Sequence, residues 1–351
     1  MTCGCMNGGK GRKQTMTKIE EIARTPLWPC SLALTLALTL ASALGAGTGA
    51  AQAQEKFPDH PINFIVPWGP GGGADLLART AGKTMSQDLG VSFPVLNVPG
   101  ATGQTGISKL LNSPADGYSL AVLIGDTYSL LAGPHPGFTA DQVIPLAIMI
   151  QQPSGYWVNT QSKWKTWQDL AATAKQQTLK VAVLGFGSAD DITTTFLNKR
   201  DGFKFEPIPY AEPELRYTSI LGGNADVLYE QTGDVRSYFD GGKIRPLIFF
   251  YPHRLSIPQF ADVPVSKELG YDVTLPQFRS IVVKAGTDPA RVKILADALA
   301  KVAQNPEFKT YLDQQYADPD SYVPMDKARV FMDSWLGQAK AILASMQTGS
   351  K

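Results

Sequence analysis

The chain has 351 residues, of which 44% are hydrophobic, 18% charged and 9% aromatic. This composition is typical of a globular protein with two medium lobes or one large α/β domain, and it excludes an intrinsically disordered chain. The chain has 32 Lys and Arg and 31 Asp and Glu, so it is nearly neutral. It therefore lacks the excess of positive charge that binds the phosphates of nucleic acid, and nucleic acid is not an expected partner.

The N-terminal segment separates from the rest by composition. Five basic residues precede an apolar run of fourteen residues at 31–44, and a small-residue stretch then ends at Ala51-Gln52-Ala53. This order is typical of a cleaved secretory signal. A membrane anchor is the alternative, but a spanning helix needs about 20 apolar residues. We therefore expect residues 1–53 to be a signal peptide, with translation from Met1 or Met16, and the mature protein to be periplasmic.

Removal of this segment restricts the chemistry of the mature protein. It takes away all three cysteines and leaves 27 basic and 29 acidic residues. Disulfides, thiol catalysis and cysteine metal sites are thereby excluded. The three histidines each adjoin a proline, and the GxSxG and HExxH patterns are absent, so we expect no catalytic residue, metal or cofactor. A hydrolase in the same crevice is the least favoured alternative.

The mature chain opens with a strand and a glycine turn. The apolar run at 61–67 predicts a buried parallel strand, the spacing over 76–89 predicts a helix, and WGPGGGAD at 68–75 lies between them. Strand, glycine loop and helix N-terminus in this order form an anion cradle, because glycine lets N–H groups converge and the helix dipole favours negative charge. The stretch matches neither the P-loop nor GxGxxG. A plain strand-to-helix turn capped by Asp75 therefore remains open.

Two further units repeat this design. We expect a strand at 93–98, a loop at 99–106 and a short helix at 107–111, then a strand at 119–124 that ends in Gly125-Asp126-Thr127. The carboxyl ends of parallel strands meet at one edge of an α/β sheet, where such sheets bind ligands. The pattern therefore predicts a ligand crevice.

Short motifs spread across residues 56–351 resemble the motifs of one known protein family. They are Phe57-Pro58 through Pro61-Ile62, IVPWGPGGGAD at 65–75, NVPGATG at 97–103 with Gly106, PADGY at 114–118, and shorter pieces at 209–210, 221–226, 242–247, 263–264, 268–270 and 284–287. In this order the chain resembles the Bug family of extracytoplasmic solute receptors, the substrate-binding proteins of tripartite tricarboxylate transporters. The resemblance implies an α/β fold of the type II periplasmic binding class, with two lobes, two crossovers and a ligand cleft between them.

The residues agree with a second set of strand–helix units from Tyr156 to Pro276. We expect lobe I at 54–156, lobe II at 157–277, and the return to lobe I with the C-terminal helices at 278–351. Within these ranges the sequence predicts a crossover at 157–159, a helix at 167–175, a strand at 179–184, a loop at 185–191, a return strand at 278–283 and closing helices at 289–316 and 326–347.

The resemblance also implies how a ligand carboxylate is held, largely by backbone N–H groups of the first two glycine loops. The residues placed beside the proximal carboxylate are Trp68, Gly71, Gly72 and Gly73, with Gly103, Gln104 and Thr105 opposite. Thr127 and Ser188 are expected donors. Asp75 is expected to cap its helix, because like charges repel, and Asp126 to be structural or to hold a water.

Departures from the family pattern bear on the ligand. The second-lobe loop reads GFGSADD, with Asp190 and Asp191, and Tyr210 is followed by AEPELR ending at Arg216. Arg216 is a candidate partner for a distal carboxylate, with an ion pair to Glu212 or Glu214 or plain exposure as the alternative. Arg279 is the other candidate partner for the distal carboxylate. For Asp226 and Glu230 the alternative is a purely structural role.

Six aromatic residues fall in segments expected near the cleft: Trp68, Tyr128, Tyr156, Trp157, Tyr210 and Phe278. They would suit an aromatic acid, although each taken singly is more typical of a lobe core. We expect a small organic carboxylate, with an aromatic dicarboxylate slightly favoured over an aliphatic one. The expected partners are the permease subunits of the transporter, and the chain is expected to be a monomer. A receptor for a membrane sensor and a binding protein for phosphate-like anions are the alternatives.

Overall fold

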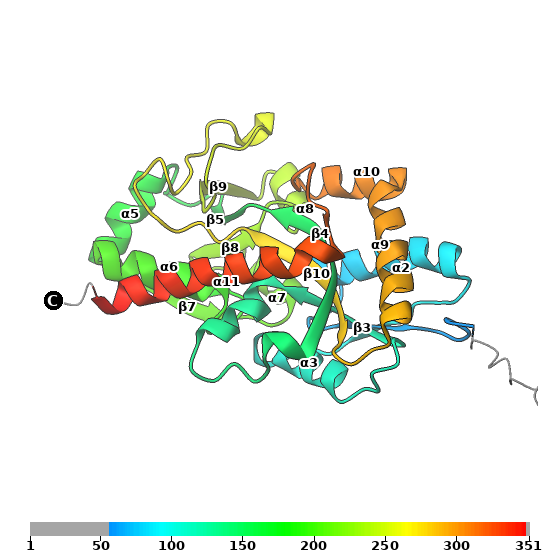
Figure 1. Cartoon of the computed structure of the whole chain (residues 1–351). Helices are drawn as coiled ribbons and strands as arrows, with labels where there is room; N and C mark the ends of the chain where they lie inside the picture. The colour runs from blue at the N-terminus through cyan, green and yellow to red at the C-terminus, as the bar shows by residue number, and fades with distance from the viewer. Residues whose placement is uncertain (1–55, 349–351) are drawn as a thin grey trace, which may run out of the picture. The chain divides into compact units, whose positions relative to one another are not determined.

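The computed structural model describes residues 56–348, which form two lobes, each built on one β-sheet (Figure 1). The chain passes from the six-stranded sheet of lobe I to the five-stranded sheet of lobe II between Gln152 and Ser154, and it is back in the first sheet at Gln277.

Lobe I contains a mixed sheet with strand order β11-β4-β10-β3-β1-β2. Its strands are β1 (Asn63–Val66), β2 (Val95–Asn97), β3 (Ser119–Ile124), β4 (Val143–Gln152), β10 (Gln277–Lys284) and β11 (Val323–Pro324). β1 pairs in parallel with β2 and β3, whereas β10 runs antiparallel to β3 and β4. The predicted arrangement of three parallel strands with a common carboxyl edge is confirmed.

The helices of lobe I follow these strands. They are α2 (Gly73–Leu89), α3 (Gln104–Leu111), α4 (Gly125–Tyr128), α9 (Pro289–Gln304) and α10 (Pro306–Gln314), with short 3-10 turns at Ala101–Gly103, Ser129–Ala132 and Ala140–Gln142. α9 packs on α2 and on β4. The apolar residues of α2, β1 and α9 form a core on one face of the sheet, as expected for a parallel sheet covered by helices.

Lobe II contains the strand order β7-β6-β8-β5-β9. Its strands are β5 (Ser154–Asn159), β6 (Leu179–Val183), β7 (Phe205–Pro209), β8 (Val227–Gln231) and β9 (Ile244–Phe249), and its helices are α5 (Trp167–Gln176), α6 (Ala189–Asp201), α7 (Pro213–Ser219) and α8 (Arg236–Asp240), with a 3-10 turn at Pro258–Phe260. β6 is parallel to β7 and β8, so the loops after these strands also leave from one edge of the sheet.

Several expected elements differ in their bounds: the helix expected at 76–89 begins at Gly73, and the crossover expected at 157–159 lies within β5. The expected helix 289–316 is two helices, because Pro306 has no backbone N–H to continue α9 and the Asn305 side chain instead accepts from the N–H of Glu307 at 2.8 Å. α3 begins at Gln104 rather than at 107. The expected loop 185–191 ends at Ser188, and its last three residues form the first turn of α6.

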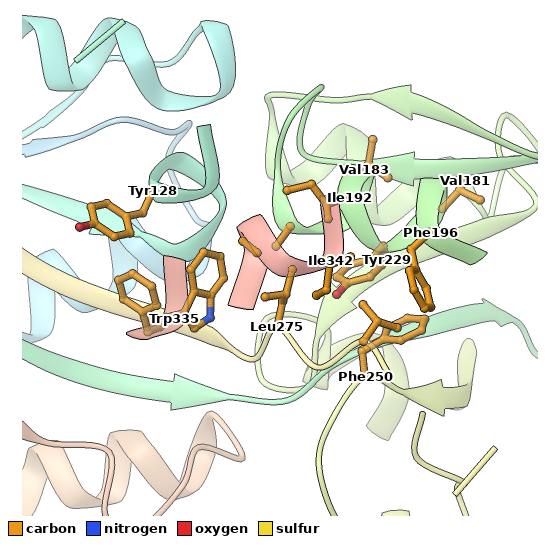
Figure 2. Close-up of a cluster of buried hydrophobic side chains, with 14 of the residues drawn as sticks. Tyr128, Val181, Val183, Ile192, Phe196, Tyr229, Phe250, Leu275, Trp335 and Ile342 are labelled. Atoms are coloured by element: carbon orange, nitrogen blue, oxygen red, sulfur yellow. The ribbon is translucent and has the colours of Figure 1, made fainter. Parts of the chain in front are cut away.

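The C-terminal helix α11 (Met325–Thr348) packs on both lobes. It contacts β4 and the 3-10 turn at Ser129–Ala132 in lobe I and α6 in lobe II, and Figure 1 shows it running along both. Its inward positions are Ala328, Met332, Trp335, Ala339, Ile342 and Met346, whose spacing of three and four residues makes one helical stripe. Figure 2 shows Trp335, Leu275 and Ile342 between Tyr128 of lobe I and Phe196 of lobe II. The two lobes therefore share one hydrophobic core.

Candidate ligand-binding site

The glycine loop of lobe I connects β1 to α2. α2 begins after Gly72, which offers no side chain to cap it, so its first N–H groups have no capping side chain. Asp75 accepts the Gly71 N–H at 3.0 Å and pairs with Arg79 at 2.9 Å. Burial opposes the charge of Asp75, but the hydrogen bonds from Arg79, Gly71 and Asn97 outweigh it and lower the pKa of its carboxyl. Asp75 therefore lies in the first turn of α2 and stabilises the glycine loop by accepting the Gly71 N–H. It is not the helix cap that we expected.

A small cavity lies where this loop faces lobe II. Its lining residues are Trp68, Gly72, Gly73, Ala74, Ile124 and Arg279 from lobe I, and Leu184, Pro213, Arg216, Tyr217, Gln231 and Asp234 from lobe II. The space that it leaves for the centres of water-sized molecules is about 20 Å³, which suits about one water. The lobes are therefore closed on each other in this structure.

The closure depends on glycine in the loop. A Cβ on Gly72 would stand 2.7 Å from Cγ of Pro213, and one on Gly73 would overlap both Nη2 of Arg279 and Oδ1 of Asp234. No side chain fits at either position while the lobes are closed. These glycines consequently allow α7 and the segment after β8 to approach the N-terminus of α2.

Arg279 of β10 forms an ion pair across the cleft with Asp234. Its Nη2 donates to Oδ2 of Asp234 at 2.6 Å, its Nη1 donates to the side chain of Gln152, and the paired side chains are 2% and 4% exposed. Burial opposes the guanidinium charge, but Asp234 outweighs it and raises the pKa of Arg279. Arg279 is therefore a fixed cation at the N-terminus of α2.

Arg216 of α7 is also buried, and its partner is Glu230 of β8. Nε of Arg216 donates to Oε2 of Glu230 at 2.7 Å, and Nη1 donates to the carbonyl of Tyr210 at 3.0 Å. Burial raises the pKa of Glu230 to about 7, although Arg216 opposes this shift. The expected alternatives for Arg216, a pair with Glu212 or Glu214 or solvent exposure, are wrong, because the side chain is 4% exposed and meets Glu230.

The second-lobe loop carries two acidic residues at the start of α6. Ser188 accepts from the Asp191 N–H as the helix cap, and Asp191 accepts from the Gly187 N–H at 2.8 Å. Asp190 accepts from the Leu184 N–H at 2.9 Å. Burial and the carboxylate of Asp126 raise the pKa of Asp190 well above its ordinary value. These carboxylates therefore organise the loop, and none of the three residues lines the cavity.

Asp126 joins the two lobes. Its Oδ1 accepts the Ala189 N–H at 3.0 Å, and its Oδ2 accepts from the side chain of Gln277. A carboxylate at the N-terminus of α6 is favoured by the helix dipole. These contacts give Asp126 the structural role that we expected for it.

Five of the predicted ligand-binding residues line the cavity: Trp68, Gly72, Gly73, Arg216 and Arg279. The other seven lie outside its lining: Gly71, Gly103, Gln104, Thr105, Thr127, Ser188 and Tyr210. Among these, Thr105 is exposed, whereas Thr127 is buried against Gly103. Asn97, which precedes the second glycine loop, donates to the carbonyl of Trp68 in the first loop at 2.9 Å.

Three polar lining residues were missed by the sequence reasoning: Tyr217, Gln231 and Asp234. Gln231 ends β8, and Asp234 follows it, at the same carboxyl edge as the loop after β6. The rule that ligands bind at the carboxyl ends of parallel strands would have found both, had the strand at 227–231 been placed beside the one at 179–183.

Three buried polar atoms at the cavity have no hydrogen-bond partner among the described residues. They are Nε1 of Trp68, the hydroxyl of Tyr217 and Oδ1 of Asp234. Buried polar atoms are nearly always hydrogen-bonded, and each exception needs an explanation. Two of the three can donate and one can only accept, which suits a ligand that carries both kinds of group.

The aromatic residues expected near the cleft mostly serve the cores. Tyr128, Tyr156, Trp157 and Phe278 are fully buried in hydrophobic clusters. Of the six, Trp68 alone lines the cavity. The rings pack against other rings, and the ring centroids of Tyr156 and Phe250, for example, are 5.1 Å apart. Most of the aromatic residues expected to line the cleft therefore lie in the lobe interiors.

A second, wider cavity of about 440 Å³ lies beside Gln104. Its lining residues are Gln104, Ser129, Leu130, Gly133, Pro134, His135, Phe186, Gly187, Asp191, Ile192, Thr195, Leu343 and Met346. No Lys or Arg lines it and Asp191 does, so it is poorly suited to a carboxylate. The smaller cavity is the better candidate.

Two kinds of feature are absent from residues 56–348. No helix in that range is both long and apolar enough to cross a membrane. The same part of the chain gathers no group of three or more His, Cys, Asp and Glu side chains that could hold a metal ion.

Comparisons with known proteins agree on one family. Residues 77–347 match the model of the tripartite tricarboxylate transporter family receptor. A protein of Cupriavidus necator described as "UPF0065 protein in gbd 5'region" is 30% identical over 306 residues, which cover 84% of this chain and 90% of that protein.

Two solved structures share the fold. The periplasmic binding protein BugD has a TM-score of 0.76 at 22% identity, covering 83% of this chain and 99% of that one. MatC from Rhodopseudomonas palustris, solved with bound malate, has a TM-score of 0.75 at 21% identity, covering 82% of this chain and 100% of that one. Together with the glycine loop and the cleft between two α/β lobes, these matches show that the chain belongs to the Bug-type receptor family of the tripartite tricarboxylate transporters.

Proposed function

We propose that this receptor captures a small organic carboxylate in the cleft between its lobes and delivers it to the permease subunits of a tripartite tricarboxylate transporter. The observation that carries the proposal is the N-terminus of α2, which faces the cavity beside Arg279 and the indole N–H of Trp68. Within residues 56–348, no side chain caps this helix and no acceptor pairs with that indole N–H. Helix N–H groups, an arginine and an indole donor together favour an anion.

Closure completes the site. Beyond the ion pair of Arg279, the Ser129 hydroxyl donates to the carbonyl of Gly187 at 2.7 Å and the Thr102 hydroxyl to that of Phe186 at 3.1 Å. The present cavity leaves room for about one water. A ligand therefore enters an open form at lobe I, and lobe II then closes over it and excludes water.

The ligand class is supported by charge and by relatives. Malate, named with MatC, is an aliphatic dicarboxylate. Because four of the six aromatic residues are used in the cores, we place aliphatic carboxylates ahead of aromatic ones, which reverses the order expected from the sequence. The seven predicted residues outside the present lining remain candidates for contact in the liganded form.

Periplasmic residence follows from the family and from the signal predicted at residues 1–53, which lies outside the described residues. The receptor expressed with its own N-terminal segment should be recovered from the periplasm with Gln54 as its first residue. Mass determination of the exported protein tests this cleavage.

The binding proposal is tested by isothermal titration and thermal unfolding of the exported protein after refolding to remove ligand. The panel contains aliphatic and aromatic mono- and dicarboxylates, phosphate, sugars and sulfate. A ligand at 100 times its Kd adds about 2.7 kcal/mol to the free energy of unfolding, so binding of carboxylates alone supports the proposal. A response confined to phosphate or sugars contradicts it.

A further inference from the structure

Only one oxygen of the Asp234 carboxylate is hydrogen-bonded to Arg279. Arg279 gives Nη2 to Oδ2 of Asp234 but turns Nη1 to Gln152, so the pair lacks the two parallel hydrogen bonds of a bidentate arrangement. Oδ1 has no hydrogen-bond partner among the described residues, and the side chain is 4% exposed. A buried carboxylate oxygen without a hydrogen-bond donor is unfavourable, because it has lost its contacts with water and gained no partner.

The unused oxygen lies at the proposed anion cradle. A Cβ built on Gly73, the first residue of α2, would overlap Oδ1 of Asp234, and Asp234 lines the same cavity as Gly72 and Gly73. Oδ1 of Asp234 therefore lies beside the helix N-terminus that we propose holds the ligand carboxylate. When the lobes close over a ligand and exclude water, a donor that the ligand carries beside its carboxylate supplies the hydrogen bond that Oδ1 lacks.

The charges around the cavity support the same conclusion. Arg279 is balanced by Asp234, and Arg216 is balanced by Glu230. The two ion pairs therefore leave the lining without an excess of positive charge. A hydroxyl or ammonium group beside the first carboxylate complements Asp234, whereas a plain methylene leaves it unpaired.

Resting on the proposed function, we propose that Asp234 determines specificity by accepting a hydrogen bond from a hydroxyl or ammonium group of the ligand. The receptor then selects 2-hydroxy- or 2-amino-carboxylates over otherwise identical carboxylates that carry hydrogen at this carbon. A site built to hydrogen-bond a donor rejects the analogue that lacks it, because its own polar group is left unpaired.

The test uses ligands matched in length. Succinate, malate and aspartate form one series, and glutarate, 2-hydroxyglutarate and glutamate form a second, each titrated into the wild-type protein by calorimetry. We expect one donor-bearing member of a series to bind at least about tenfold more tightly than the donor-free member. Which of the two leads distinguishes a hydroxyl from an ammonium ligand.

The matched variants are Asp234→Asn and Asp240→Asn. In Asp234→Asn, Arg279 draws the amide oxygen toward itself, so the NH2 group replaces Oδ1 and meets a ligand donor with another donor. The preference for the donor-bearing ligand should fall to about onefold or reverse. Asp240 pairs with Arg236 at 3.1 Å on the surface and is 50% exposed, so its replacement should leave the preference unchanged.

The outcomes separate the two proposals. Equal binding of donor-free and donor-bearing carboxylates by the wild type overturns the role of Asp234 and leaves the carboxylate receptor standing. A preference that survives Asp234→Asn overturns it as well. If no carboxylate binds at all, the proposed function fails and this inference with it. Should Asp234→Asn not fold, the wild-type ratio alone decides.

Discussion

At the scale of single residues, the cleft is governed by two buried arginines whose partners come from β8 and the segment after it. Glu230 of β8 meets Arg216 at 2.7 Å, and Asp234 meets Arg279 at 2.6 Å. A buried ion pair contributes little net stability but fixes geometry, because loss of either partner leaves an uncompensated charge. These pairs set the shape and charge of the site more than its aromatic residues do.

Glu230 gives the folded protein a pH dependence. Burial raises its pKa to about 7 from an ordinary value of 4.5, so between these values the folded protein binds more protons than the unfolded chain. The free energy of unfolding attributable to this group therefore falls as pH rises from 4.5 to 7, by up to about 3 kcal/mol. Denaturant unfolding of the wild type and Glu230→Gln at intervals of pH measures it.

The difference between the two proteins isolates Glu230 from the other acidic groups. Wild type minus Glu230→Gln should decrease through this window and become constant above pH 8. Asp190, whose pKa is raised mainly by burial and by Asp126, titrates in both proteins, and the smaller contribution of Glu230 to that shift is part of the measured difference. A difference that rises with pH would show that Arg216 holds Glu230 ionised and would contradict the prediction.

At the scale of elements, α6 shows how a loop expected to meet ligand is instead a helix start. Ser188 is fully buried, and its hydroxyl accepts the Asp191 N–H at 3.2 Å. A Ser followed by acidic residues is a strong helix N-terminus. The expected donor role of Ser188 is therefore in competition with its capping role.

Ser188→Ala should lower the free energy of unfolding by about 1 kcal/mol, because a cap is lost. Asn305→Ala removes the cap of α10, whose side chain accepts from the Glu307 N–H, and should cost a similar amount. Chemical unfolding measures both. Ligand titration then tests whether Ser188 has a second role, with Asn305→Ala as the control, because Asn305 does not line the cavity.

If Ser188 serves only as a cap, Ser188→Ala and Asn305→Ala will bind ligand equally well. A loss of affinity confined to Ser188→Ala would restore Ser188 as a ligand donor. Unchanged stability in Ser188→Ala would contradict its capping role.

At the scale of the whole molecule, α11 makes the two lobes one folding unit. Its 24 residues extend about 36 Å at 1.5 Å per residue, enough to pack on β4 and on α6. Trp335 is 3% exposed, contacts the ring of Phe278 at 5.3 Å, and donates to the carbonyl of Pro276 at 2.9 Å. It thus lies against the return crossover between the lobes.

This shared core predicts a single unfolding transition for residues 56–348, although two-lobed proteins often unfold in steps. Trp335→Ala should cost about 3–5 kcal/mol and lower the midpoint without splitting the transition. Val330→Ala, at a side chain that is 70% exposed on the same helix, should change the free energy of unfolding by less than about 0.5 kcal/mol. Calorimetry, together with two structural probes of unfolding, measures the midpoint and shows whether the transition splits. Two separate transitions in the wild type would show that α11 does not couple the lobes.

The sequence alone was sufficient for the features that depend on near neighbours along the chain. The periods of apolar residues located β1, α2 and α11, and the glycines after 67 located the loop between β1 and α2. The break between α9 and α10 at Asn305-Pro306 was missed, although it too is encoded locally. Strand–helix alternation also predicted that three strands would be parallel, since such units almost always form this way.

Only the tertiary structure decided the partners of the buried charges and the rings. Arg279 and Asp234 are 45 residues apart, and they meet because β10 returns to lobe I while the segment after β8 reaches across the cleft. Tyr156 and Phe278 lie at the crossovers in the chain but point into cores. Which face of a crossover strand is buried depends on the sheets packed around it, and no local pattern carries that information.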